Sequence, residues 1–180
     1  MSPAYAPGPV RPRALYENWR PPVVGVGVLV PVGADHLVLV RTCGTLAIPT
    51  GTVEDAQSPT DAARSVLTGL PGGLPVQRHI AVEHVQMRRR QVTTHAVVTR
   101  SLLPEQVKRL TYRDPRAKVC IVPTTDAVAA LTERGRARVL LGLQALAIGA
   151  TAYVDDGRIQ LEFTPADTSP RFTFERTAAP

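Results

Sequence analysis

Residues suited to acid–base chemistry cluster between positions 79 and 95 of the sequence. His79, Glu83, His84 and His95 fall there in two segments with an extended, apolar-rich pattern. On an ideal strand His79 and Glu83 share one face, and His84 points to the other. A neighbouring histidine and glutamate can exchange protons with a substrate or help to bind a metal, although half-buried histidines held by ordinary hydrogen bonds are commoner. His79 and Glu83 are therefore candidate catalytic residues, and their spacing with His95 matches no known metal-binding signature.

A second group of acids surrounds residues 54–61. Glu54, Asp55 and Asp61 could supply oxygen ligands to a hard cation. They could equally be solvated acids in a loop and at a helix start, where the helix dipole favours negative charge. Glu54 and Asp61 are thus further catalytic candidates, weighed against that simpler role.

Three consecutive arginines separate the two extended segments. Arg88, Arg89 and Arg90 are predicted to lie at or near the tip of an antiparallel hairpin. Their guanidinium groups could bind a phosphate or carboxylate with paired hydrogen bonds, and Arg41, at the end of an earlier strand, could line the same cleft. The alternative interpretation is a solvated hairpin tip.

The rest of the chain predicts the elements that position these side chains. Ser58 and Pro59 begin a helix of about three turns, in which apolar residues recur every three or four positions until Pro71. Asp156-Gly157 marks a hairpin over residues 153–163. The predicted strands are 23–32, 36–41, 76–87, 91–100 and 118–122, and the further helices are 124–131 and 135–148. This order indicates a mixed α/β sandwich rather than a regularly alternating parallel sheet.

The stretch Pro49-Thr50-Gly51-Thr52-Val53-Glu54, followed by the capped helix, resembles the box of the Nudix family. That motif reads glycine, any five residues, glutamate, any seven, arginine–glutamate, an apolar residue, any residue, glutamate–glutamate, any residue, glycine and an apolar residue. With its first glycine on Gly51, its four glutamates fall on Gln57, Val66, Gly69 and Leu70. Every carboxylate of the motif is therefore absent from these positions.

The resemblance extends beyond the box and implies both a fold and a chemistry. The order of elements over residues 20–148 is similar to a whole Nudix domain, which implies an α/β/α sandwich with a mixed central sheet. In that family, helix carboxylates one turn apart bind Mg²⁺, which polarises a diphosphate for attack by water. Val66 and Leu70 offer no oxygen ligand and are predicted to form an apolar ridge instead. We therefore expect no metal, no cofactor and no magnesium-dependent hydrolysis.

The predicted function is that of a Nudix-fold protein that does not hydrolyse diphosphates. As such a pseudoenzyme it would bind a small anionic or partly apolar ligand and act as an accessory or regulatory protein. The predicted ligand-binding residues are Arg41, Gly51, Glu54, Val66, Leu70, Arg88, Arg89 and Arg90. One alternative is a divergent Nudix enzyme, with relocated acids or histidines, that acts on a nucleoside-diphosphate-like or specialised-metabolite substrate. Another is a protein-interaction module whose C-terminal hairpin pairs with a partner or with a second copy, giving a homodimer.

Composition limits these possibilities. The basic chain of 180 residues and 19.4 kDa has a net charge of +6 and 4% aromatic residues. Its length predicts one Nudix-like domain at 23–150, between a proline-rich tail at 1–22 and a C-terminal hairpin and tail at 151–180. The charge allows anionic ligands, whereas the scarcity of aromatic residues disfavours single-stranded nucleic acid. No apolar run reaches the ~18 residues of a membrane span, and the N-terminus lacks the order of a secretory signal, so we expect a cytoplasmic protein.

Overall fold

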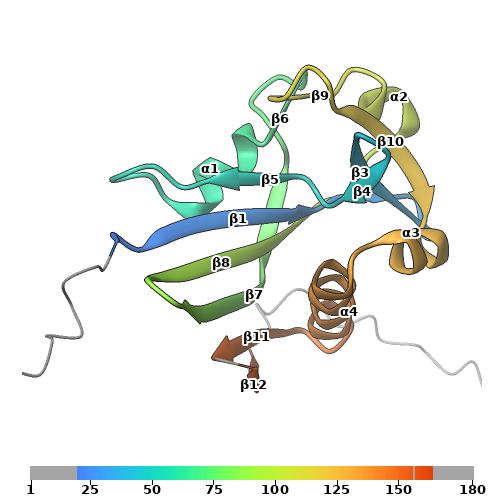
Figure 1. Ribbon diagram of the computed structural model, residues 1–180. Helices are drawn as coiled ribbons and strands as arrows, with labels where there is room; N and C mark the ends of the chain where they lie inside the picture. Colours follow the sequence, from blue (N-terminus) through green and yellow to red (C-terminus); the bar gives the residue numbers. More distant parts are fainter. Residues whose placement is uncertain (1–19, 156, 164–180) are drawn as a thin grey trace, which may run out of the picture.

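A six-stranded mixed sheet forms the centre of the computed structural model, which describes residues 20–155 and 157–163 (Figure 1). Its strand order is β12-β11-β7-β8-β1-β5. The strands are β1 (Val23–Leu29), β5 (Thr50–Thr52), β7 (Val76–Met87), β8 (Arg90–Thr99), β11 (Ala150–Asp155) and β12 (Arg158–Phe163). β1 runs parallel to β8 and β11 runs parallel to β7, whereas the other neighbours are antiparallel. The predicted mixed sheet is confirmed.

A second sheet has the order β10-β3-β2, and β4 pairs with β3. Its strands are β2 (Pro31–Val32), β3 (His36–Thr42), β4 (Thr45–Ala47) and β10 (Lys118–Pro123). A two-stranded ladder joins β6 (Leu67–Thr68) to β9 (Thr111–Tyr112). The segment predicted as one strand over 23–32 is thus divided between two sheets, because β1 ends at Leu29 and Pro31 begins β2.

Helices cover both faces of the six-stranded sheet. The helices are α1 (Pro59–Ser65), α2 (Pro104–Val107), α3 (Thr124–Ala130) and α4 (Glu133–Ala147). Successive side chains of a strand point to opposite faces. Accordingly Val26 and Val97 pack with Ala63 of α1, whereas Ala96 packs with Val139 of α4 in a second core cluster. The sheet therefore has an α1 face and an α4 face.

The α1 helix is shorter than predicted. It begins as expected, with the Ser58 hydroxyl oxygen accepting the backbone N–H of Asp61 at 3.1 Å, but it ends at Ser65. The chain then enters β6 and reverses through Gly69, whose φ is +113°. Val66 and Leu70 pack in or against the core cluster beneath α1, so their spacing reflects burial of the chain beyond the helix. The predicted three-turn helix and its apolar ridge are wrong.

Two predicted hairpins are confirmed. β7 and β8 pair around a turn that holds Arg88 and Arg89, and Arg90 is the first residue of β8. β11 pairs with β12 from Ala150 opposite Phe163 to Asp155 opposite Arg158. Because β11 also pairs with β7, the C-terminal hairpin extends the central sheet.

Residues 1–19 and 164–180, which hold most of the two predicted tails, lie outside the described residues. Asp156 in the second hairpin lies outside them as well. In the described part of the chain, no helix is long and apolar enough to cross a membrane.

Candidate functional site

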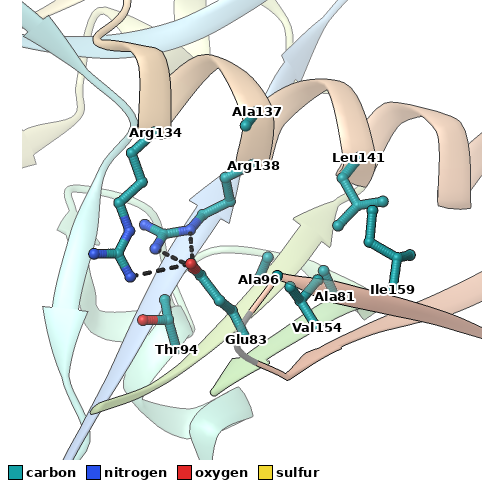
Figure 2. A pocket seen from close by; sticks show the side chains of 11 residues that line it. Ala81, Glu83, Thr94, Ala96, Arg134, Ala137, Arg138, Leu141, Val154 and Ile159 are labelled. Atoms are coloured by element: carbon teal, nitrogen blue, oxygen red, sulfur yellow. Dashed lines mark hydrogen bonds and ion pairs between the residues drawn. The ribbon is translucent and has the colours of Figure 1, made fainter. Parts of the chain in front are cut away.

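A cavity of about 290 Å³ lies between the α4 face of the sheet and the first half of α4 (Figure 2). It is lined by Ala81, Glu83, Thr94, Ala96, Arg134, Ala137, Arg138, Leu141, Val154, Gly157 and Ile159. Ala81 and Ala96 are directly opposed on β7 and β8, and Ala137 lines the same cavity from α4. Small side chains leave a hollow where larger ones would fill the space between the layers. We call this hollow the α4 cavity.

One end of the α4 cavity is charged. Arg138 donates to Glu83 Oε2 from Nε at 3.1 Å and also from Nη2, and Arg134 Nη2 donates to Glu83 Oε1 at 3.0 Å. The two arginines are four residues apart and so lie on the same side of α4, from which both point toward Glu83 (Figure 2). The Glu83 and Arg138 side chains are only 20% and 18% exposed, whereas Arg134 is 52% exposed. Arg134 therefore stands at the mouth of the cavity.

The charge of Glu83 is fixed by its surroundings. Burial raises the pKa of its carboxyl group, but the hydrogen bonds and positive charges of Arg138 and Arg134 outweigh burial and lower that pKa. Two guanidinium groups and one carboxylate leave this end with one net positive charge. The other end, near Leu141 and Ile159, is apolar (Figure 2). The cavity can therefore accommodate an apolar group and an anionic group at opposite ends.

A β-bulge separates the two predicted partners His79 and Glu83. Pairing of β7 with β8 shifts between His79, which is opposite Val97, and Ala81, which is opposite Ala96. The shift turns His79 to the α1 face, where its Nε2 lies 3.2 Å from the Thr60 hydroxyl oxygen. Glu83 points to the α4 face, so the prediction that these two side chains share a face is wrong.

Three histidines lie on the α1 face instead. The rings of His79 and His95 meet edge to face, with centroids 5.6 Å apart, and His84 Nδ1 lies 2.9 Å from the Thr93 hydroxyl oxygen. Burial lowers the pKa of both His79 and His95, and the neighbouring histidines lower that of His95 further. Within the described residues, the buried Nδ1 of His95 has no hydrogen-bond partner. Because their pKa values are lowered, the His79 and His95 rings favour the neutral form near pH 7.

The acids around α1 are engaged locally or exposed. Ser58 Oγ donates to one carboxylate oxygen of Asp61 at 2.6 Å, and Arg64 Nη1 donates to the other at 2.9 Å. Glu54 is exposed in the loop before the helix. In the part of the chain that the structure describes, no three His, Cys, Asp or Glu side chains gather closely enough to hold a metal ion.

The predicted apolar ligand surface is part of the core. Val66 is 5% exposed, and a Cβ atom added to Gly51 would lie 2.9 Å from its Cγ2. Leu70 is half-buried against the same cluster. Because Gly51 has no side chain, β5 can pack closely against Val66, the residue that follows α1.

The predicted arginines lie apart from the α4 cavity. Arg41 is at the end of β3, opposite Lys118 in the second sheet. Arg88 and Arg89 are exposed in the β7–β8 turn. None of the eight predicted ligand-binding residues lines this cavity, and of the four catalytic candidates only Glu83 does so.

Arg134 and Arg138 are the functional candidates that the sequence analysis missed. The helix predicted over 135–148 contains Arg138 and begins one residue after Arg134, and the four-residue spacing of the two arginines was the available signal. A second cavity, of about 440 Å³, is lined by Val32, Gly33, Asp35, His36, Ser101, Leu102, Leu103, Pro104 and Ile121. Its ionisable side chains are an exposed Asp35–His36 pair, so it lacks the fixed charged groups of the α4 cavity.

Solved structures identify the class of fold. The E. coli ORF135 protein matches with a TM-score of 0.53 and 13% identity over 72% of this chain and 92% of that chain. A MutT protein from Methanosarcina mazei Go1 matches with a TM-score of 0.54 and 14% identity, over 71% and 95% of the two chains. A Nudix hydrolase from Nitrosomonas europaea matches with a TM-score of 0.53 and 10% identity, over 76% and 80%. No protein-family model and no curated protein matches the sequence.

The chain therefore has the Nudix fold, as its box-like segment and element order predicted.

Proposed function

We propose that this protein binds a small amphipathic anion in the α4 cavity and does not hydrolyse diphosphates. The observation that carries the proposal is the division of the cavity into an apolar end near Leu141 and a positive end at Arg134 and Arg138. A ligand with an apolar body and one carboxylate or phosphate group would match both ends. The protein would then act as an accessory or regulatory ligand-binding protein.

The charged end retains hydrogen-bond donors for such an anion. A guanidinium group carries five N–H donors, and Arg134 uses one nitrogen on Glu83 among the described residues. Glu83 is a positioning residue in this proposal, because it holds both arginines at the end of the cavity. Since the set carries a net positive charge, an anion is attracted to it rather than repelled.

The absence of hydrolysis is inferred from the residues around α1. Both carboxylate oxygens of Asp61 already accept hydrogen bonds, from Ser58 and Arg64. Glu54 is exposed, and Val66 is buried. Mg²⁺ that assists cleavage is usually bound by one or two protein carboxylates together with substrate phosphates, and around α1 the Asp61 carboxylate is already engaged and Val66 has no oxygen to offer.

A divergent enzyme has weaker support. Glu83 is paired with two arginines and its pKa is lowered, which makes it a poor proton acceptor near pH 7. His79 lies on the opposite face of the sheet and lines neither of the two cavities. We therefore favour binding over catalysis.

Thermal shift followed by calorimetry tests the proposal. The probes are aryl carboxylates, medium-chain carboxylates and nucleoside monophosphates, each with and without Mg²⁺. A probe at about 100 times its Kd adds about 2.7 kcal/mol of stability, which raises the Tm by about 5–10 °C for a chain of this size. Arg134→Gln should weaken binding about tenfold, whereas Arg109→Gln, at an exposed position outside the cavity, should bind like the wild type. Magnesium-dependent diphosphate cleavage, or anion binding that Arg134→Gln leaves unchanged, would overturn the proposal.

A further inference from the structure

Among residues 20–155 and 157–163, β12 is an edge strand of the central sheet with one side unpaired. It pairs with β11 on one side, and the strand order ends there (Figure 1). The register with β11 runs through all six residues without a shift, so no bulge interrupts the strand. The outer N–H and C=O groups of such a strand can pair with another chain.

The side chains of β12 are sorted by face. Ile159 and Leu161 point to the α4 face, opposite Val154 and Ala152, and they are 58% and 38% exposed. Arg158, Gln160 and Glu162 point to the other face, and all three are exposed. Within residues 20–155 and 157–163, neither Arg158 nor Glu162 forms an ion pair. The strand therefore presents two exposed apolar side chains on one face and two unpaired opposite charges on the other.

We propose that β12 pairs antiparallel with β12 of a second copy of this chain, in a register centred on Gln160. A two-fold axis through Gln160 places Arg158 of each copy opposite Glu162 of the other. The same register places Ile159 of each copy opposite Leu161 of the other, on the α4 face. Opposite charges and paired apolar side chains both stabilise cross-strand neighbours.

Other registers lose this match. A two-fold axis through Leu161 places Glu162 opposite Gln160, and one through Ile159 places Arg158 opposite Gln160. Charge complementarity therefore selects both the occupant, a second copy, and the alignment of the two strands.

The pairing would also reach the α4 cavity. Ile159 lines the cavity, so Leu161 of the second copy would extend its apolar rim. The dimer does not depend on ligand binding, because every contact that defines it comes from β12.

Sedimentation equilibrium of the full chain tests the pairing. The wild-type mass should rise from 19.4 kDa toward twice that value over about a hundredfold increase in concentration. Glu162→Arg and Arg158→Glu should each remain monomeric, because each places like charges opposite one another. The double variant should dimerise again, and an equimolar mixture of the two single variants should form a mixed dimer, because both of its charge pairs are then opposite in sign. Glu105→Arg and Arg109→Glu, at exposed positions outside β12, are the matched controls and should behave like the wild type.

A crosslink provides a second measurement. Across the proposed axis the two Gln160 Cα atoms would lie about 4.5–5.5 Å apart, within the range of a disulfide. Gln160→Cys in a Cys43→Ser background, oxidised by oxidised glutathione, should therefore form a covalent dimer, and Gln91→Cys in that background should not. A wild-type mass that stays at 19.4 kDa, dimers that survive each single charge reversal, or single variants that fail to associate when mixed would overturn the proposal.

Discussion

Replacement of Glu83 by glutamine should destabilise the protein by about 2 kcal/mol. Glu83 accepts charge-assisted hydrogen bonds from Arg138 and Arg134, and its side chain is 20% exposed. Breaking a buried ion pair costs about 3–5 kcal/mol, whereas an exposed pair contributes about 0.2–1 kcal/mol. The Glu83–Arg138 contact lies between these limits, and glutamine would turn an amide N–H₂ or a neutral oxygen toward two cations.

The contribution of each arginine should follow its exposure. Arg138 is 18% exposed, so Arg138→Gln should also cost about 2 kcal/mol, whereas Arg134→Gln, with its side chain 52% exposed, should cost less than about 1 kcal/mol. Urea unfolding at neutral pH measures these values, and 2 kcal/mol corresponds to a fall in Tm of about 4–8 °C. Glu105→Gln is the control, since its exposed contact with Lys108 is 3.8 Å long. Equal costs for the two arginine variants, or no effect of Glu83→Gln, would refute the reasoning.

The advantage of wild type over Glu83→Gln should also depend on pH. The pKa of the Glu83 carboxyl is lowered in the folded protein, so the unfolded chain takes up its proton first as the pH falls. The stabilisation is therefore present above about pH 4.5 and is lost as the pH falls through the lowered folded-state pKa. Unfolding of both proteins at several pH values should converge in the acid range.

Three further effects should be measurable by denaturant unfolding. Burial lowers the pKa of His79 and His95, so the unfolded chain binds more protons than the folded protein at acid pH. The free energy of unfolding should therefore decrease as the pH falls below about 6.5, and His95→Gln should reduce this dependence on pH. Gly69→Ala should cost more than about 3 kcal/mol, because φ is +113° there and a Cβ atom would collide with a backbone carbonyl, whereas Gly33→Ala, at φ +61° in open space, should cost about 1 kcal/mol. Arg78→Met should cost about 2 kcal/mol, because Arg78 Nη2 donates to two backbone carbonyl oxygens, one of them in the last turn of α4.

Local signals in the sequence predicted most of the elements. Ser58 and Pro59 mark the start of α1 because capping is a contact between residues three apart. The β7–β8 hairpin follows from two extended runs around Arg88 and Arg89. The end of α1 could not be predicted in the same way. Val66 and Leu70 continue the apolar spacing beyond the helix, because tertiary packing buries them there.

The site was less predictable because it depends on contacts between distant elements. Glu83 was identified, but its partners lie more than fifty residues later on α4, where Arg134 and Arg138 look like ordinary solvated residues. The face of His79 was also wrong, because a one-residue shift in pairing reverses every side chain that follows. The residue types around His79 do not predict that shift in strand pairing.

The fold of this chain does not by itself specify the chemistry of its site. At 10–14% identity, the three solved structures compared above share its architecture, and architecture alone does not specify an activity. On the α1 face, Val66 and Ala63 are packed into the core, and the rings of His79 and His95 meet edge to face. On the α4 face, alanines leave a hollow and Glu83 fixes two guanidinium groups at its end. An amphipathic anion is therefore inferred from the side chains of one face, which the shared fold by itself would not have indicated.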